Sequence, residues 1–395
     1  MRQAWRGLAL LAVGALTMGG SVALAHDGGG HGNVNGALAP TIFTMPTADG
    51  NPEGVAFDKK SGRFFVSRTG TGAIYVGTLD SHTLQPFIAG GEAGDAPLAT
   101  GLKVRKGLLY VAGASTGQIR IYDLADPAKA PVVFETGGGF INDLDLTPDG
   151  DVYATDSTKP AIYKVSAAAV KAGTGAVETI NVAPEITVDT TPGVFNLNGI
   201  VAKNDHELIV VQSNTGKLYR ITLGDSVTDR KITEIEVDGG PLIGGDGLLL
   251  DRGRLLVVRG TNGSEPPAKG SNGVVDVVKL RHHRTEGEVV KEITDDSFAG
   301  PSTIARAKKL LLVVNANFAN AETADDSTFT VTGLARKAAD HGGHGHGDKA
   351  KDDKAKADNS GHGNAGDKDA KDDKVKDDNS GHGNAGDRKD DDGGH

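Results

Sequence analysis

The 395-residue sequence contains no cysteine, which excludes disulfide bonds and thiolate metal ligands. Aromatic residues make up only 5% of the chain, and its one tryptophan, Trp5, lies near the N-terminus. Because no basic patch with interleaved aromatic residues occurs, we expect no nucleic-acid partner. No apolar run reaches the ~20 residues that a membrane-spanning helix needs, so we expect no membrane insertion.

The first 25 residues contain the three parts of a secretory signal peptide. Arg2 and Arg6 precede an apolar run at residues 8–16, and the small residues Ala23 and Ala25 mark the expected cleavage point. We therefore expect a secreted protein, located outside the cell or in the cell envelope. Residues 26–39 are rich in Gly and His and cannot bury an apolar face, so they are expected to form a disordered leader.

The last segment, residues 337–395, has a different composition from the rest of the chain. It is rich in His, Asp and Lys, and the stretch at residues 358–367 recurs unchanged at residues 378–387. With almost no apolar residues, this segment is predicted to be a disordered tail. Its histidines, which include His341, His344 and His346, could bind Zn²⁺, Ni²⁺ or Cu²⁺. The alternative is a hydrated spacer that keeps the preceding domain in solution.

One pattern occurs six times between residues 40 and 336. A polar residue with a side-chain oxygen leads into a short apolar strand, a tight turn and a second strand. The leading residues, at intervals of 47, 42, 56, 48 and 56 residues, are Glu53, Thr100, Asn142, Asn198, Asp246 and Ser302. Six repeats of this length predict an all-β, six-bladed β-propeller, which we expect to be a monomer. We expect the strand at residues 41–45 to complete the last blade by pairing with the strand near residues 329–331.

The leading residues are expected to converge, because the first strand of each blade lines the central channel. Two carboxylates and two amides, without Cys or His, make a hard oxygen site that suits Ca²⁺ or another divalent cation. The expected metal ligands are Glu53, Asn142, Asn198 and Asp246. The alternative is a polar cap satisfied by hydrogen bonds. The second strand of each blade ends at the face where the leading residues lie, so we expect this face to bind the substrate. The expected substrate-lining residues are Thr100, Phe140, Asp156, Asn214, Arg259 and Ser302.

Four segments, in order over roughly residues 50 to 320, resemble the senescence marker protein/gluconolactonase/luciferin-regenerating family of six-bladed, calcium-dependent propellers. They are Pro52-Glu53-Gly54, Asn142-Asp143, Leu197-Asn198-Gly199-Ile200 and Gly245-Asp246-Gly247. The resemblance implies that Glu53, Asn198 and Asp246 bind the metal. It also implies that Asn142 contacts the metal or the substrate, and that Asp246 is the catalytic acid/base or nucleophile. The sequence departs from the family where it has Phe140, because lactonase members commonly place an Arg there.

Together with the expected signal peptide, the resemblance implies a secreted, Ca²⁺-dependent hydrolase that acts on a small-molecule lactone, ester or phosphotriester. Two alternatives stay open. The first is a non-enzymatic metal-binding propeller that binds a ligand or a partner. The second is an envelope protein that buffers metal ions through its His-rich tail.

Overall fold

The computed structural model describes residues 39–46, 49–91, 98–260, 272–318 and 328–335. The expected signal peptide, the leader up to residue 38 and the His-rich tail lie outside the described residues, so their expectations stay predictions. The described part of the chain holds no helix with the length and apolar character needed to cross a membrane.

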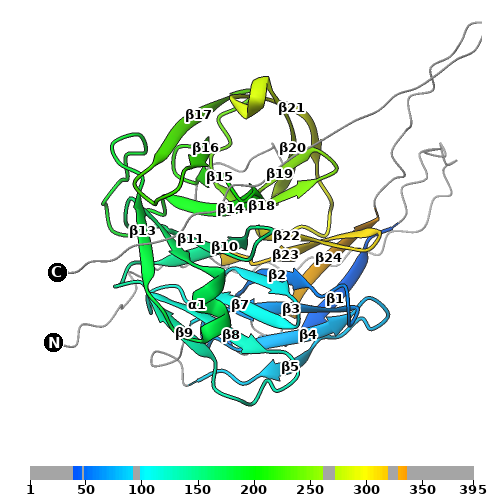
Figure 1. Cartoon of the computed structure of the whole chain (residues 1–395). Coiled ribbons are helices and arrows are strands. Elements are labelled where there is room, and N and C mark those ends of the chain that lie inside the picture. Colours follow the sequence, from blue (N-terminus) through cyan, green and yellow to red (C-terminus); the bar gives the residue numbers. More distant parts are fainter. Residues whose placement is uncertain (1–38, 47–48, 92–97, 261–271, 319–327, 336–395) are drawn as a thin grey trace, which may run out of the picture. The chain divides into compact units, whose positions relative to one another are not determined.

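The described residues form six four-stranded antiparallel blades, which confirms the predicted all-β propeller (Figure 1). Blade 1 contains β2 (Pro52–Phe57), β3 (Arg63–Arg68), β4 (Ile74–Thr78) and β5 (Gln85–Ile88). Blade 2 contains β6 (Leu102–Arg105), β7 (Leu108–Ala112), β8 (Gln118–Asp123) and β9 (Val132–Glu135). Blade 3 contains β10 (Ile141–Leu146), β11 (Val152–Asp156), β12 (Ala161–Val165) and β13 (Val177–Asn181).

The outermost strands of blades 4 and 5 pair with each other in parallel, so these two blades share one eight-stranded sheet. Blade 4 contains β14 (Leu197–Asn204), β15 (Glu207–Gln212), β16 (Lys217–Leu223) and β17 (Arg230–Asp238). Blade 5 contains β18 (Gly245–Asp251), β19 (Arg254–Arg259), β20 (Val274–Arg281) and β21 (Glu286–Ile293). Two short helices, α1 (Ala167–Ala172) and η1 (His282–Arg284), lie in the connections before β13 and β21.

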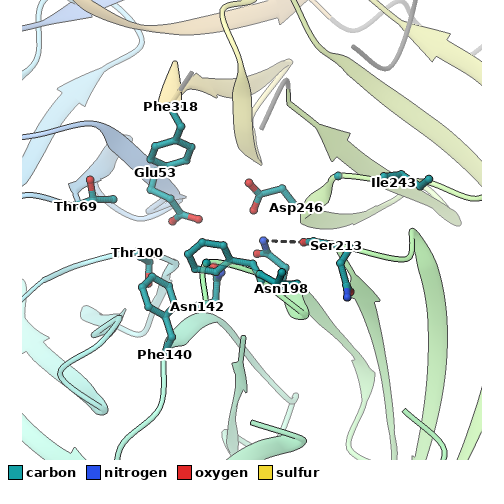
Figure 2. Close-up of a pocket in the computed structure, with 15 residues that line it drawn as sticks. Glu53, Thr69, Thr100, Phe140, Asn142, Asn198, Ser213, Ile243, Asp246 and Phe318 are labelled. Carbon is teal, nitrogen blue, oxygen red and sulfur yellow. Dashed lines mark hydrogen bonds between the residues drawn. The ribbon is translucent and has the colours of Figure 1, made fainter. Parts of the chain in front are cut away.

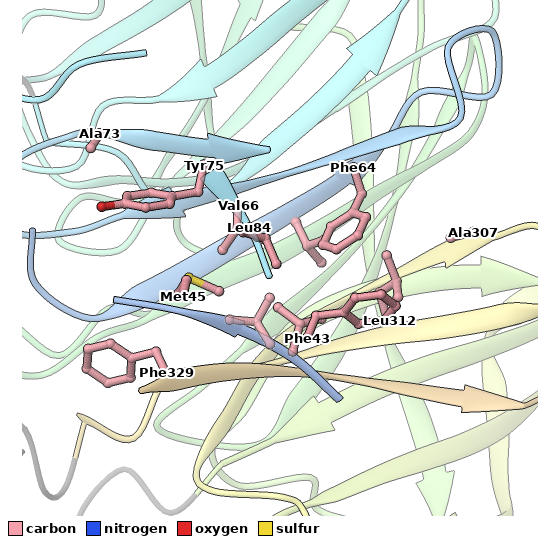
Figure 3. Close-up of a cluster of buried hydrophobic side chains, with 13 residues drawn as sticks. Phe43, Met45, Phe64, Val66, Ala73, Tyr75, Leu84, Ala307, Leu312 and Phe329 are labelled. Atoms are coloured by element: carbon pink, nitrogen blue, oxygen red, sulfur yellow. The ribbon is translucent and has the colours of Figure 1, made fainter. Parts of the chain in front are cut away.

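Blade 6 is built from both ends of the described chain. It contains β22 (Pro301–Ala307), β23 (Leu310–Asn315), β24 (Phe329–Ala335) and β1 (Thr41–Met45). As predicted, β1 pairs with β24, and Phe43 lies opposite Val331. The Phe43 ring also packs edge-to-face on Phe64 of blade 1, with ring centroids 5.0 Å apart (Figure 3). The first strand therefore joins blade 6 to blade 1 and closes the ring.

The apolar core lies between neighbouring blades. The second strands are buried along their whole length in β11 and β15, because both of their faces are covered. The cluster in Figure 3 joins blades 6 and 1 through Phe43, Phe64 and Leu312, and equivalent clusters fill other seams. Packing between blades therefore fixes where each innermost strand lies.

The innermost strands approach one another closely where each repeat begins. A Cβ atom on Gly54 would lie 2.3 Å from the Thr100 carbonyl oxygen, and one on Gly199 would lie 2.1 Å from the Asp246 carbonyl oxygen. Only glycine fits such contacts, which explains why a glycine follows the polar residue in these repeats.

The polar residue of five repeats lies at an irregularity in strand pairing. The register shifts between Pro52 and Val55 in β2, and the same shift recurs in four other innermost strands, β10, β14, β18 and β22. A bulge of this kind bends the strand and redirects a side chain. At the end of the central channel, the leading side chains are therefore redirected away from the regular alternation of the sheet.

Candidate metal and substrate site

A cavity of about 750 Å³ opens at the end of the channel where the repeats begin. All four candidate metal ligands line it, and Figure 2 shows the carboxylate groups of Glu53 and Asp246 pointing into the same space beside Asn142 and Asn198. These side chains come from β2, β10, β14 and β18, and each is no more than 5% exposed. The propeller therefore brings together residues from four separate repeats.

Hydrogen bonds fix the orientation of the two side-chain amides. Asn142 Nδ2 donates to Ser157 Oγ at 2.8 Å, and Asn198 Nδ2 donates to Ser213 Oγ at 3.1 Å. Each serine hydroxyl donates in turn to a carbonyl oxygen of the next blade: Ser157 to Leu197 and Ser213 to Gly245. Because each serine uses its only hydrogen this way, it must accept from the amide nitrogen, and both amide oxygens are left for the cavity.

Three buried oxygen atoms of the candidate ligands have no hydrogen-bond partner among the described residues. They are Glu53 Oε2, Asn142 Oδ1 and Asn198 Oδ1. Buried polar atoms are nearly always satisfied, so three unsatisfied acceptors around one space point to a missing electropositive partner. Carboxylate and amide oxygens are the ligands that Ca²⁺ accepts, and the donor set fits a hard divalent cation.

The electrostatics of the two carboxyl groups agree with this fit. Burial, followed by the charges of Asp246 and Asp143, raises the pKa of Glu53 well above its usual value of 4.5, and Lys103 opposes the shift. Burial and then Asp143 raise the pKa of Asp246 well above 3.8, and a hydrogen bond from Asn198 opposes that shift. A cation between the two carboxylates would favour their ionised forms.

Among the described residues, no three or more His, Cys, Asp or Glu side chains form a cluster that could hold a metal ion, so a metal at the candidate site would depend on the two amides as well as the two carboxylates. At the candidate site, amides supply half of the side-chain donors, and nitrogen and sulfur ligands do not contribute. This composition suits Ca²⁺ better than Zn²⁺.

Three of the expected substrate-lining residues, Thr100, Phe140 and Asn214, line the cavity. Thr100 also supports the ring, because its Oγ1 donates to the Ile141 carbonyl oxygen at 2.9 Å. The other three, Asp156, Arg259 and Ser302, lie outside the cavity lining.

The side chains of Asp156 and Ser302 are occupied by structural hydrogen bonds. Asp156 is fully buried; its Oδ1 accepts from the backbone N–H groups of Phe140, Thr158 and Lys159, and its Oδ2 accepts from the Tyr163 hydroxyl. Asp156 thus shapes a turn beside the cavity. Ser302 Oγ donates to the Glu53 carbonyl oxygen at 2.8 Å, and it holds blade 6 against blade 1.

Arg259 is turned away from the cavity by a carboxylate on the neighbouring strand. Its guanidinium forms a two-point ion pair with Asp276 of β20, with Nη2 and Oδ1 3.0 Å apart. Asp276 is fully buried. This pair satisfies a buried charge, so it accounts for Arg259 without a substrate contact.

The outer part of the cavity is apolar, which the sequence pattern did not reveal. Val194, Phe195, Ile243 and Phe318 line it together with Phe140. Phe140 and Phe195 meet edge-to-face, with centroids 5.0 Å apart and an interplanar angle of 78°. Phe195, Ile243 and Phe318 lie in connections between strands, where apolar residues show no periodicity that would place them.

No protein-family model matches the sequence, and no curated protein matches it. Among solved structures, the major allergen Mala s 1 of Malassezia sympodialis is similar with a TM-score of 0.56 and 16% identity, covering 78% of this chain and 100% of that chain. A luciferin-regenerating enzyme is similar with a TM-score of 0.53 and 12% identity, covering 75% and 96%. The gluconolactonase XC5397 of Xanthomonas campestris is similar with a TM-score of 0.50 and 14% identity, covering 77% and 93%.

Two of these structural neighbours are a gluconolactonase and a luciferin-regenerating enzyme, so the predicted resemblance is confirmed for the fold. Identities this low carry the fold alone. Activity must be argued from the residues of this site.

Proposed function

We propose that the protein is a Ca²⁺-dependent hydrolase of a lactone, ester or phosphotriester, with its active site at the channel mouth. The observation that carries the proposal is the set of unsatisfied buried oxygens of Glu53, Asn142 and Asn198 at the base of an open cavity. Asp246 faces the same space and completes four oxygen donors. Another divalent cation of similar size would satisfy the same donors.

The chain's own residues supply positioning and proton transfer. A bound divalent cation would polarise the carbonyl or phosphoryl oxygen of the substrate. Asn142 and Asn198 keep their amide oxygens facing the cavity because Ser157 and Ser213 hold their nitrogens. Asp246, at the cavity base, is the group placed to take a proton from an attacking water. As water oxygen bonds to the carbonyl carbon or phosphorus, the bond to the leaving oxygen breaks, and that oxygen receives the proton from Asp246.

Calcium titration calorimetry on the purified full chain, followed by hydrolysis assays, tests the proposal. Wild type should bind Ca²⁺ and hydrolyse at least one member of a chromogenic panel of lactones, esters and phosphotriesters, and a chelator should stop turnover. Glu53→Gln should weaken Ca²⁺ binding, and Asp246→Asn should abolish turnover. Glu234→Gln is the matched control, because Glu234 forms an exposed pair with Lys217 on the neighbouring strand and lies outside the cavity lining. A wild type that is inactive across the panel with calcium present would contradict the hydrolase.

A second candidate function is ligand binding without turnover, and the apolar outer wall of the cavity favours it. In that case calcium and the ligand should each raise the melting temperature, and no substrate should be consumed. The same panel distinguishes the two functions, because a lactone that competes with the ligand for the cavity but is not hydrolysed indicates binding alone.

A further inference from the structure

Exposed apolar side chains gather at the cavity mouth. Phe195, Ile243 and Phe318 are 43%, 48% and 38% exposed, and they are three of the five large hydrophobic side chains with the greatest exposure in the described chain. All three line the cavity. Exposed apolar groups that cluster at one opening mark a binding surface, whereas scattered ones do not.

The aromatic part of this wall is held in a defined arrangement. Phe140 and Phe195 form an edge-to-face pair, so each ring limits the movement of the other. The backbone N–H of Phe140 donates to Asp156 Oδ1 at 3.0 Å, which anchors the segment that carries it. In Figure 2, Phe318 lies beside Glu53 and Phe140 lies near Thr100 and Asn142, with the polar ligands between the two rings in this view. Both rings line the cavity, so a ligand that reaches the polar side chains also contacts apolar surface.

The hydroxyl hydrogens of the cavity are already used by the protein. The hydroxyl groups of Thr69, Thr100 and Ser213 donate to the carbonyl oxygens of Asn51, Ile141 and Gly245. The Asn214 amide nitrogen donates to Asn196 Oδ1 at 3.3 Å. A polyhydroxylated ligand needs several free donors and acceptors, and leaving its hydroxyl groups unpaired would cost affinity.

The charges of the cavity do not suit an anionic ligand. Among the described lining residues none is Lys, Arg or His, and the only charged groups are the carboxyls of Glu53 and Asp246. A divalent cation would neutralise these two carboxylates and leave no net positive charge. The side chains of the described lining therefore offer no ion pair to a substrate carboxylate or phosphate.

We infer that the substrate is uncharged, with one reactive carbonyl or phosphoryl group and a large apolar part of ring or long-chain type. The apolar part contacts Phe140, Phe195, Ile243 and Phe318, and the reactive group reaches Asp246. Sugar-acid lactones and anionic phosphate esters are excluded as good substrates. This inference rests on the proposed function for the reactive group, but the apolar subsite can be tested separately by binding.

The binding test uses N-phenyl-1-naphthylamine, a neutral apolar fluorophore, with the full chain in the presence of calcium. We expect its fluorescence to rise on binding, γ-undecalactone to displace it, and glucono-δ-lactone to leave it bound. Displacement by both lactones at similar concentrations, or no binding of the fluorophore, would overturn the inference.

Variants locate the binding surface. Phe195→Ser and Ile243→Ser alter exposed side chains, so the fold should tolerate them, and each should raise the dissociation constant of the fluorophore about tenfold. Val290→Ser is the matched control, because Val290 is 42% exposed on β21 and lies outside the cavity lining. Equal effects in the control and the cavity variants would overturn the assignment.

Hydrolysis assays separate this inference from the proposed function. If undecalactone displaces the fluorophore and neither it nor any member of the chromogenic panel is hydrolysed, the apolar subsite stands and the hydrolase fails. If the protein hydrolyses glucono-δ-lactone faster than undecalactone, the hydrolase stands and the inferred substrate class is wrong.

Discussion

Asn142 and Ser157 are joined by a hydrogen bond of 2.8 Å that ties the candidate metal site to the seam between two blades. Ser157 accepts from the Asn142 amide and donates to the Leu197 carbonyl oxygen of the next blade at 2.6 Å. Ser213 repeats this arrangement for Asn198 and Gly245. The orientation of each amide oxygen therefore depends on contact with the neighbouring blade.

Replacing Ser157 with Ala should weaken cation binding without removing any ligand. The Asn142 amide would lose its acceptor and could rotate, and the Leu197 carbonyl oxygen would lose its donor. Each lost hydrogen bond costs about 1 kcal/mol, so we expect Ca²⁺ affinity to fall about fivefold and the melting temperature to drop. Calorimetric titration of Ser157→Ala measures this. Ser226→Ala is the control, since Ser226 forms hydrogen bonds only within its own exposed loop. Unchanged calcium affinity in Ser157→Ala would show that the amide is held by other contacts.

The polar residues of the base were predictable from the sequence because they repeat in phase with the blades. Glu53, Asn142, Asn198 and Asp246 stand at equivalent places in their repeats, and a closed ring brings equivalent places together. Ser157 and Ser213 were missed. Serine is common where strands end, and its partner lies on another blade, so sequence spacing alone did not distinguish these two from ordinary turn residues.

Other details depended on side-chain direction, which topology does not supply. Asp156 and Arg259 end their strands at the predicted face, but Asp156 turns into its own loop and Arg259 turns toward Asp276. The apolar wall is formed by connections such as the one that carries Phe195, and these have no strand or helix periodicity.

In the cation-free protein, stability should fall as pH rises because of Glu53 and Asp246. Their pKa values are raised in the folded state, mainly by burial, so the folded protein keeps these protons to higher pH than the unfolded chain. When the folded state binds more protons, the free energy of unfolding decreases with pH. The decrease starts near the unfolded values, about 4, and continues through the raised folded values. Bound calcium should instead favour the ionised carboxylates, so the affinity of the protein for calcium should be lost as the pH is lowered.

Thermal melts of chelator-treated protein measure this effect against Glu53→Gln. Other carboxyl groups also titrate, so the informative quantity is the difference in melting temperature between the two proteins. That difference should favour Glu53→Gln increasingly as the pH rises, because glutamine cannot ionise. A difference that is constant with pH would show that Glu53 has an ordinary pKa. Glu234→Gln is the control for the removal of an exposed carboxylate outside the cavity lining.

Replacing Gly199 with Ala should destabilise the seam between blades 4 and 5. The added Cβ would lie 2.1 Å from the Asp246 carbonyl oxygen, and backbone on both sides would have to move. We expect a loss of about 3 kcal/mol or more and weaker calcium binding. Gly107→Ala is the control, because Gly107 has φ +82° with nothing within 4 Å of its Cβ position. It should cost only the backbone strain of about 1 kcal/mol and leave calcium binding unchanged. Chemical denaturation and calorimetry compare the two variants, and equal losses would contradict the close approach.

Arg259 should contribute to stability through Asp276 and not to substrate binding. Arg259→Leu would leave the Asp276 carboxylate fully buried without its ion-pair partner, which costs about 3 to 5 kcal/mol. The double variant Arg259→Leu/Asp276→Leu removes both charges, and replacing a buried ion pair by apolar side chains is often neutral. We therefore expect the double variant to regain most of the stability that the single variant loses, with unchanged calcium affinity in both. Denaturation curves and calorimetry decide between the two roles. Should Arg259→Leu keep its stability but bind the apolar lactone more weakly, Arg259 would belong to the substrate site after all.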